Sequence, residues 1–361
     1  MIKLKPNHLV ENLSRQNDIG ENRNGFYRLD KNERVTPFNK SDIKNILKSI
    51  NDNDLSSYAD QSTLYKKISK YLSIDINQIL ITPGSDAAIK YIFETFVSKN
   101  DLVGYLNPTY AMIEVYANLY GAKSFKIGFD KNLNYKFNEF DKLFKLKPKI
   151  IFIANPNQPT GTIIPDRKLD QIISKAVKLG TLIVLDQAYI EFSKAKKRYK
   201  DLEKLGNLII TNTFSKAFGL AGTRIGYMAS SKKIINLTYR VKPLSDINIL
   251  AIKSAEYLLK NKNILNKYVK DVNASKILLK KFCDQNQIEF INSEANFIHM
   301  RINRNIDLIS KYMRKRKYLI RTTGSGLPAT IQNCIRITLG PPKLMKKFIV
   351  NFKEALSNIS K

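Results

Sequence analysis

The feature that most constrains this chain is a repeated alternation between short apolar segments and amphipathic segments with helical spacing. The apolar segments have the continuous hydrophobicity of strands that are buried on both faces, which is typical of parallel sheets. Strands that alternate with helices predict a mostly parallel sheet covered by helices on both faces. The expected strands are residues 79–82, 102–105, 149–154, 181–185 and 208–211, and the expected helices include residues 62–72, 87–97 and 166–179.

The pattern changes after about residue 245, which predicts a second unit. One long helical stretch over residues 249–279 leads there to short strands. We therefore expect a large three-layer α/β/α domain at residues 41–245 and a smaller α+β domain at residues 246–361. The strands expected in the smaller domain lie near residue 290, at 297–300 and at 334–338.

The chain is strongly basic, with 61 Lys and Arg against 31 Asp and Glu and a net charge of +30. Such a charge can indicate a nucleic-acid-binding protein, because lysine and arginine release counterions from phosphate backbones. The basic residues are scattered along the chain, however, and the densest runs, 194–197 and 314–317, are typical of solvated surfaces. We therefore do not expect nucleic acid as a partner, but expect faster encounters with small phosphorylated anions.

Histidine and cysteine are rare, with only His8, His299, Cys283 and Cys334. No His/Cys metal site and no disulfide framework is predicted, and a Ser-His-Asp hydrolase would need a histidine in a recognisable setting. Proton transfer is therefore expected to use lysine, tyrosine or a carboxylate.

Residues 1–8 do not form a secretory signal, and no apolar stretch approaches the roughly 18 residues that span a membrane. We expect a cytoplasmic protein without a membrane partner.

Chemically versatile residues follow several expected strands. Parallel sheets bind ligands at the carboxyl ends of their strands, so Gly84, Asp186 and Lys216 are expected on one rim. An amine that forms an imine must be partly deprotonated, which nearby cations and desolvation promote. Arg224, eight residues after Lys216, can hold a dianionic phosphate beside that amine. Asp186 is either a helix cap or the partner of a buried cation such as a pyridinium nitrogen.

Other residues on this rim have both a functional and a structural interpretation. Ser85 and Asp86 open a helix whose dipole favours an anion, although Asp86 can also be an N-cap. Tyr110 can stack on an aromatic ring and the phenol of Tyr189 can reach a ring oxygen, although either can be an ordinary core tyrosine. The amides of residues 157–158 can bond a ring oxygen, although turn chemistry alone explains the Pro and Gly around them.

Taken in this order, the motifs resemble those of the fold-type I pyridoxal-phosphate enzymes, and most closely those of the histidinol-phosphate aminotransferase family. The resemblance runs from about residue 29 to the C-terminus. It implies the cofactor pyridoxal 5′-phosphate, a homodimer, and an N-terminal arm, residues 1–40, that joins the small domain and the substrate mouth. It rests on residues 29–33, 82–86, 108–110, 156–161, 186–189, 214–218 and 335–338.

The resemblance also implies roles for single residues. Lys216 would be the catalytic residue and would bind the cofactor aldehyde covalently. Arg336 would hold the α-carboxylate of glutamate, and Arg321 the substrate's own phosphate group. Arg34 departs from the family pattern, and its extra cation at the substrate mouth would suit an anionic substrate. The cofactor contacts implied are Ser85, Asp86, Tyr110, Asn157, Gln158, Asp186, Tyr189, Ser215, Lys216 and Arg224, with Tyr58 lent by the neighbouring subunit.

Three positions depart from the family pattern. Gln158 stands where an asparagine usually bonds the cofactor's 3′ oxygen, so either this longer amide or Asn157 would make the contact. Gln187 stands where glutamate is usual and removes a charge near the site. Arg34, followed by Pro37, stands where the common pattern is Asn-Glu-Asn-Pro.

The resemblance implies an aminotransferase that works between glutamate/2-oxoglutarate and a phosphorylated substrate, with histidinol phosphate and imidazole acetol phosphate as the best candidates. A decarboxylase of threonine or serine phosphate would share almost all the cofactor residues. An aminotransferase for another amino-phosphate or a surface-polysaccharide precursor is a further alternative. From another class, a nucleic-acid-binding protein would show salt-sensitive binding and no cofactor absorbance.

Overall fold

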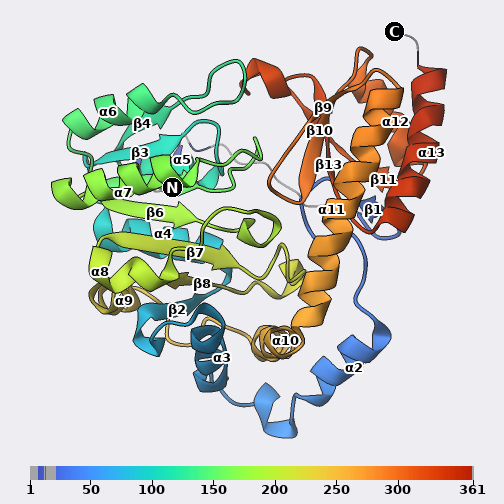
Figure 1. Ribbon diagram of the computed structural model, residues 1–361. Coiled ribbons are helices and arrows are strands. Elements are labelled where there is room, and N and C mark those ends of the chain that lie inside the picture. Colours follow the sequence, from blue (N-terminus) through green and yellow to red (C-terminus); the bar gives the residue numbers. More distant parts are fainter. Residues whose placement is uncertain (1–6, 12, 14–21, 360–361) are drawn as a thin grey trace, which may run out of the picture.

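The computed structural model describes residues 7–11, 13 and 22–359, so most of the expectation about a signal at residues 1–8 lies outside the described residues. A seven-stranded sheet with its helices occupies one side of the molecule, and a four-stranded sheet with α12 (Ile306–Lys315) and α13 (Pro342–Asn358) occupies the other (Figure 1). In the described part of the chain, no helix is long and apolar enough to cross a membrane.

The large sheet is mostly parallel, which confirms the prediction. Its strand order is β2-β8-β7-β6-β5-β3-β4, and among these described strands β8 alone runs in the opposite direction to the rest. Two of its strands were not expected from the sequence. β4 is a largely exposed edge strand with two lysines, and β8 is a short strand that begins with glycine. The strands are β2 Ile79–Thr82, β3 Leu102–Leu106, β4 Lys123–Ile127, β5 Ile150–Ala154, β6 Leu182–Asp186, β7 Leu208–Thr213 and β8 Gly226–Ala229.

Apolar residues cover both faces of this sheet. In β5, Ile150 and Phe152 pack on one face, whereas Ile151 and Ile153 pack on the other, as the alternation of side chains along a strand requires. The first face carries α4 (Gly84–Phe96), α5 (Met112–Leu119) and α9 (Lys232–Tyr239). The second carries α3 (Ser62–Leu72), α6 (Phe137–Lys145), α7 (Asp166–Leu179) and α8 (Leu202–Leu205), with α10 (Ile249–Lys260) against α3. The result is a three-layer α/β/α arrangement.

The smaller sheet has the order β12-β13-β10-β9 and is antiparallel throughout. The single helical stretch expected before it is wrong: two helices, α10 and α11 (Lys262–Gln285), meet at Asn261, whose side-chain amide donates to the Tyr257 carbonyl at 2.9 Å. Such a local side-chain bond competes with continuation of the helix. The strands are β9 Glu289–Ile291, β10 Phe297–Arg301, β12 Arg321–Thr323 and β13 Cys334–Thr338.

The N-terminal segment joins the smaller unit. Strand β1 (Tyr27–Arg28) pairs in parallel with β11 (Tyr318–Leu319), and the rings of Tyr27 and Tyr318 stack with centroids 4.9 Å apart. Helices α1 (His8–Glu11) and α2 (Lys40–Lys48) precede and follow this segment. Residues 29–35 run between the two sheets: the Leu29 carbonyl accepts a bond from Thr338 of the smaller sheet, and the Lys31 carbonyl accepts one from Lys216, just after β7 of the large sheet.

Candidate active site

A cavity of about 570 Å³ opens where the carboxyl ends of the large sheet's strands face the smaller sheet and the N-terminal segment. This is the rim on which ligands bind in open parallel sheets. Residues far apart in the sequence meet in it, including eleven of those that were expected to bind cofactor or substrate. These are Ser85, Asp86, Tyr110, Gln158, Asp186, Tyr189, Ser215, Lys216, Arg224, Arg321 and Arg336.

Lys216 lies in a tight turn directly after β7. The turn is closed by two backbone bonds, from Gly219 to the Lys216 carbonyl at 3.1 Å and from Leu220 to the Phe214 carbonyl at 2.8 Å. The Lys216 amine donates to the Lys31 carbonyl at 3.3 Å and lies 5.5 Å from the centre of the Tyr189 ring. The amine is therefore part of the cavity lining, on a half-buried side chain that is tied to the N-terminal segment.

Asp186 ends β6 and points into the same cavity as a buried carboxylate. Its Oδ1 accepts bonds from Thr211 Oγ1 at 3.1 Å and from the Ala188 N–H at 3.2 Å. Burial raises the pKa of Asp186 to about 6, although these two bonds and the charge of Lys216 oppose the shift. No lysine or arginine of the described residues pairs with Asp186 within 4 Å. A buried anion without a paired cation is costly, so this position suits a cationic ligand group.

Tyr189 is held by a residue that sequence reasoning did not assign. The side-chain amide of Asn32 donates to the Tyr189 phenol at 3.1 Å. Asn32 is fixed in turn by bonds with Thr338 and Asn296, and it has the left-handed φ of 56° that asparagine tolerates better than most residues. The only sequence signal for this role was its place in the 29–33 motif. Asp30, Lys31, Asn32 and Glu33 all line the cavity.

An anion site lies at the start of α4. The first N–H groups of a helix have no helical partner, so those of Ser85 and Asp86 are free to bind an anion. The Arg224 guanidinium lies beside this helix start, and its Nη1 is 3.4 Å from Ser215 Oγ. Sequence reasoning missed Thr213, which lines the cavity and donates to Ser215 Oγ at 2.9 Å; its place two residues before Ser215 was the available signal.

Two glycines make this anion site possible. A Cβ at Gly84, which has a φ of +78°, would lie 2.9 Å from Nη2 of Arg224. A Cβ at Gly226 would lie 2.7 Å from the Gly84 carbonyl carbon and 2.8 Å from the Ser85 nitrogen. The backbone of β8 therefore packs directly against the first turn of α4, which only glycine permits.

Two arginines lie side by side on neighbouring strands of the smaller sheet, in the other wall of the cavity. Arg321 in β12 is paired in register with Arg336 in β13, and both line the cavity. Arg336 is buried, donates to the Asp30 carbonyl at 2.8 Å, and lies 5.4 Å from the centre of the Phe297 ring. Burial and the charge of Arg321 lower the pKa of Arg336. Neither guanidinium group forms an ion pair with a carboxylate of the described residues, so the two together suit a ligand with two anionic groups.

Three expected residues lie outside the cavity lining. Asn157 is fully buried, and its amide is occupied by Thr109, Thr160 and the Pro108 carbonyl, so Gln158 is the amide that faces the cavity. The Tyr58 side chain is 90% exposed on the surface.

Arg34 was expected to touch substrate, but it packs behind the cavity between two aromatic rings. Gln187, the other departure from the family pattern, is fully buried and also outside the lining.

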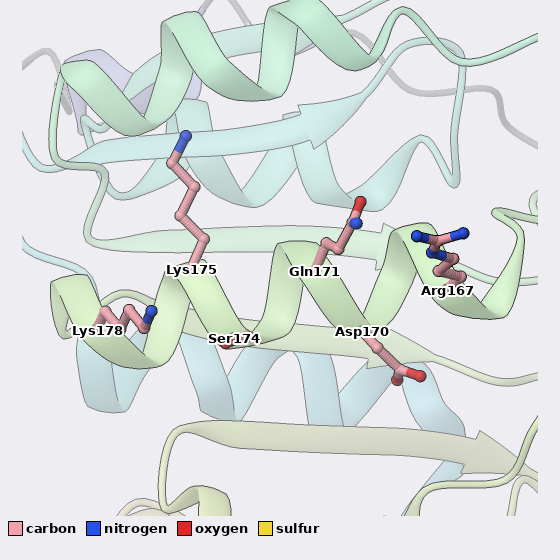
Figure 2. Close-up of a pocket in the computed structure, with 6 residues that line it drawn as sticks. All are labelled: Arg167, Asp170, Gln171, Ser174, Lys175 and Lys178. Atoms are coloured by element: carbon pink, nitrogen blue, oxygen red, sulfur yellow. The ribbon is translucent and has the colours of Figure 1, made fainter.

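A second depression, of about 760 Å³, lies on the outer surface (Figure 2). All its lining residues project from α7, and two of them form ion pairs with neighbouring elements, Asp170 with Arg198 and Lys175 with Asp141. One exposed helix face offers no convergent reactive groups, so this depression is not a catalytic candidate. Among the described residues, no three His, Cys, Asp or Glu side chains gather as metal ligands.

Comparisons with known proteins agree with this geometry. Residues 24–352 match the model of the family described as aminotransferase class I and II. The histidinol-phosphate aminotransferase of Christiangramia forsetii is 32% identical over 84% of this chain and 87% of the relative. That of Caldanaerobacter subterraneus subsp. tengcongensis is 31% identical over 97% and 100%.

Two solved structures share the fold. The histidinol-phosphate aminotransferase of Sinorhizobium meliloti, in complex with pyridoxal-5′-phosphate, has a TM-score of 0.81 and 21% identity, covering 91% of this chain and 90% of that one. The L-threonine-O-3-phosphate decarboxylase of Porphyromonas gingivalis has a TM-score of 0.74 and 22% identity, covering 92% and 99%. At this identity the likeness concerns the fold alone.

The fold and the site define a pyridoxal-phosphate-dependent aminotransferase with the fold-type I arrangement, as expected from the sequence. The chain belongs to the aminotransferase class I and II family. The residues present fit this cofactor: the cavity offers an amine for its aldehyde, a buried carboxylate for its ring nitrogen, and an anion site for its phosphate.

Proposed function

We propose that this enzyme moves an amino group between glutamate and a phosphorylated ketone, with histidinol phosphate and imidazole acetol phosphate as the substrate pair. One observation carries the proposal: Arg321 and Arg336 lie directly opposite each other on paired strands, and both line the same cavity as Lys216. The two guanidinium groups can bind a carboxylate and a phosphate in turn. The names of the curated relatives support the same substrate.

In this proposal the chain's own residues divide the work around the cofactor. Bound pyridoxal phosphate supplies an aldehyde that links amines and a cationic ring that withdraws the electron pair left when a substrate C–H bond breaks. Asp186 keeps the ring nitrogen protonated, because its buried carboxylate is stabilised by a neighbouring cation. Nζ of Lys216 takes the proton from the substrate Cα, as a positioned general base.

The remaining residues orient the cofactor and the substrate. Tyr189 and Gln158 would donate to the cofactor's ring oxygen, and Tyr110 would pack against the ring. Arg336 would hold the α-carboxylate and so fix the orientation of the substrate Cα. The phosphate group of the cofactor would be held by Ser85, Asp86 (through its backbone N–H), Ser215 and Arg224.

The first test is the half-reaction with each substrate alone. Glutamate, mixed with the cofactor-loaded enzyme, should convert the visible absorbance to that of the amine form of the cofactor, and histidinol phosphate should do the same. Threonine phosphate is the matched comparison: release of carbon dioxide from it would favour the decarboxylase. If glutamate converts the cofactor but histidinol phosphate does not, the enzyme is an aminotransferase that acts on another amino-phosphate. If glutamate converts nothing, the proposal is wrong.

We further propose that the working enzyme is a homodimer. Leu55, Tyr58 and Leu244 are exposed by 80, 90 and 81%, an unusual state for large apolar side chains. The loop that carries Leu244 is held rigid by an ion pair between Lys242 and Asp246. A second copy would cover these side chains and place Tyr58 at the neighbouring cofactor phosphate.

Sedimentation should therefore give twice the chain mass of 41.4 kDa. Leu244→Asp should weaken the dimer by roughly 10²–10⁴-fold in Kd, since each of the two copies loses the burial of one leucine, worth about 1.5–3 kcal/mol. Ile277→Asp, at an exposed position on α11, is the matched control and should leave the mass unchanged. A wild-type protein that sediments as a single chain at micromolar concentration would refute the dimer.

A further inference from the structure

Arg34 lies behind the active-site wall in an unusual setting. Its guanidinium carbon is 4.6 Å from the centre of the Phe38 ring and 4.7 Å from that of the Tyr268 ring, so the group is stacked between two aromatic faces. Nε donates to the Thr36 carbonyl at 3.1 Å, and the buried Nη1 has no hydrogen-bond partner among the residues that the structure describes. A cation between two rings is favourable once it is desolvated. This arrangement fixes the whole side chain, including its aliphatic part.

The aliphatic part of Arg34 contacts the turn that carries Lys216. A Cβ at Gly219 would lie 2.5 Å from Cδ of Arg34, so Arg34 fills the space that a side chain at position 219 would need. Gly219 has a φ of +79°, and its N–H closes the turn by bonding the Lys216 carbonyl. The Arg34 side chain therefore packs on the residue whose N–H closes the turn.

The backbone just before Arg34 reaches the active site from the other side. The Lys31 carbonyl accepts the bond from the Lys216 amine, and Asn32 donates to the phenol of Tyr189. Val35, the residue after Arg34, is wedged against Gly340, where a Cβ would lie 2.1 Å from Cγ2 of the valine. Arg34 therefore belongs to the N-terminal arm segment, residues 29–35, and packs on a separate segment, the turn that carries Lys216.

We propose that Arg34 is a positioning residue for Lys216: its stacked side chain clamps the turn that carries Lys216 against the arm segment whose carbonyl receives the Lys216 amine. The role rests on the assignment of Lys216 under the proposed function. It replaces the expectation that Arg34 binds substrate, because Arg34 is outside the cavity lining and is held by two rings.

Arg34→Met, which keeps the length but removes the charge and the planar stack, tests the proposal. It should lower the rate of both half-reactions by a similar factor of roughly ten to a hundred, because a misplacement of about 1 Å can cost about 10²-fold. KM for the phosphorylated substrate should stay within about threefold, since the substrate is not touched. Arg34→Lys keeps a cation over the rings and should recover part of the lost rate.

A second readout needs neither cofactor nor turnover. In cofactor-free Arg34→Met protein, hydrogen exchange in a peptide covering residues 214–220 should be faster than in wild type, because the Gly219 N–H is no longer held. Arg167→Met, on the exposed face of α7 (Figure 2), is the matched control and should change neither rate nor exchange. If the Arg34→Met protein does not fold, Phe38→Leu is the alternative, because it removes one of the two rings that stack on Arg34. It should give a smaller loss of rate and a smaller increase in hydrogen exchange over residues 214–220.

Two results would overturn this role for Arg34. One is a rise of tenfold or more in KM for the phosphorylated substrate with an unchanged glutamate half-reaction, which would mean that Arg34 touches substrate. The other is wild-type exchange in residues 214–220 together with wild-type rates. These results can be told apart from a failure of the proposed function. In that case the wild-type enzyme would not react with glutamate, whereas hydrogen exchange would still show whether Arg34 holds the turn.

Discussion

Lys216→Ala should reduce turnover by at least about 10⁴-fold and leave the fold intact. A positioned general base contributes roughly 10²–10⁴-fold, and loss of the covalent anchor for the cofactor adds to this. The Lys216 side chain is half-buried and its amine makes one hydrogen bond, to the Lys31 carbonyl, so its removal disturbs little packing. Single-turnover rates with glutamate, measured beside circular dichroism spectra, check both parts of the expectation.

Two matched variants show whether the amine itself is responsible. Lys216→Arg keeps a positive charge but cannot deprotonate, so it should be as inactive as the alanine variant. Lys31→Ala removes the other lysine of the cavity lining and should cost less than about tenfold, because its backbone carbonyl, not its amine, receives Lys216. A Lys216→Ala enzyme within tenfold of wild type would remove Lys216 from its role.

Asp186→Asn should reduce turnover by roughly 10²–10³-fold while making the cofactor-free protein more stable at neutral pH. The loss of rate is the usual scale for removing one preorganised electrostatic partner. The gain in stability arises because burial raises the pKa of Asp186 from its ordinary 3.8 to about 6. At neutral pH the folded protein must therefore hold a buried charge that the unfolded chain keeps in water.

The pH dependence follows from the direction of this shift. Between pH of about 4 and 6 the folded state binds more protons at Asp186 than the unfolded state, so its stability falls as the pH rises through this range. Above about pH 6 the free energy of unfolding of cofactor-free Asp186→Asn should exceed that of wild type by about 1–3 kcal/mol. Below about pH 4, where Asp186 is protonated in both states, the difference should vanish. Urea unfolding at several pH values measures it.

Asp186→Glu is the control that keeps the carboxylate. It should retain more activity than the asparagine variant and should not show the gain in stability above pH 6. An Asp186→Asn enzyme with wild-type turnover would mean that no cationic ring nitrogen lies against this position. A cofactor-free Asp186→Asn protein that is no more stable than wild type at pH 8 would mean that the carboxylate is not desolvated.

The sheet and the rim were predictable because they depend on local patterns. Continuous apolar segments that alternate with helices predict parallel strands, and parallel strands bring their carboxyl ends to one edge. Asp186 is the last residue of β6 and Lys216 follows the neighbouring strand β7, so the strand pattern alone predicted that the two residues meet at one edge. Strand β4 was missed because its exposed edge position allows lysines in place of apolar residues.

Contacts between distant segments could not be predicted in the same way. The sequence predicted a positive charge at Arg34 near the substrate mouth. It did not predict that the rings of Phe38 and of Tyr268 in α11 would stack on this side chain. Asn157 and Gln158 are neighbours in one turn, and only the packing of Pro108 and Thr109 decides which of the two amides faces the cavity. Such choices depend on tertiary packing that local sequence does not encode.

The most direct measurement is borohydride reduction of the cofactor-loaded enzyme, followed by mass spectrometry of its peptides. Reduction turns the bond between an enzyme amine and the cofactor aldehyde into a stable one, so the modified side chain can be identified. The mass of the reduced cofactor should appear on the peptide that contains Lys216, and Lys216→Ala protein should show none there. A cofactor mass on another lysine, or on no lysine of a protein that stays colourless, would contradict the account.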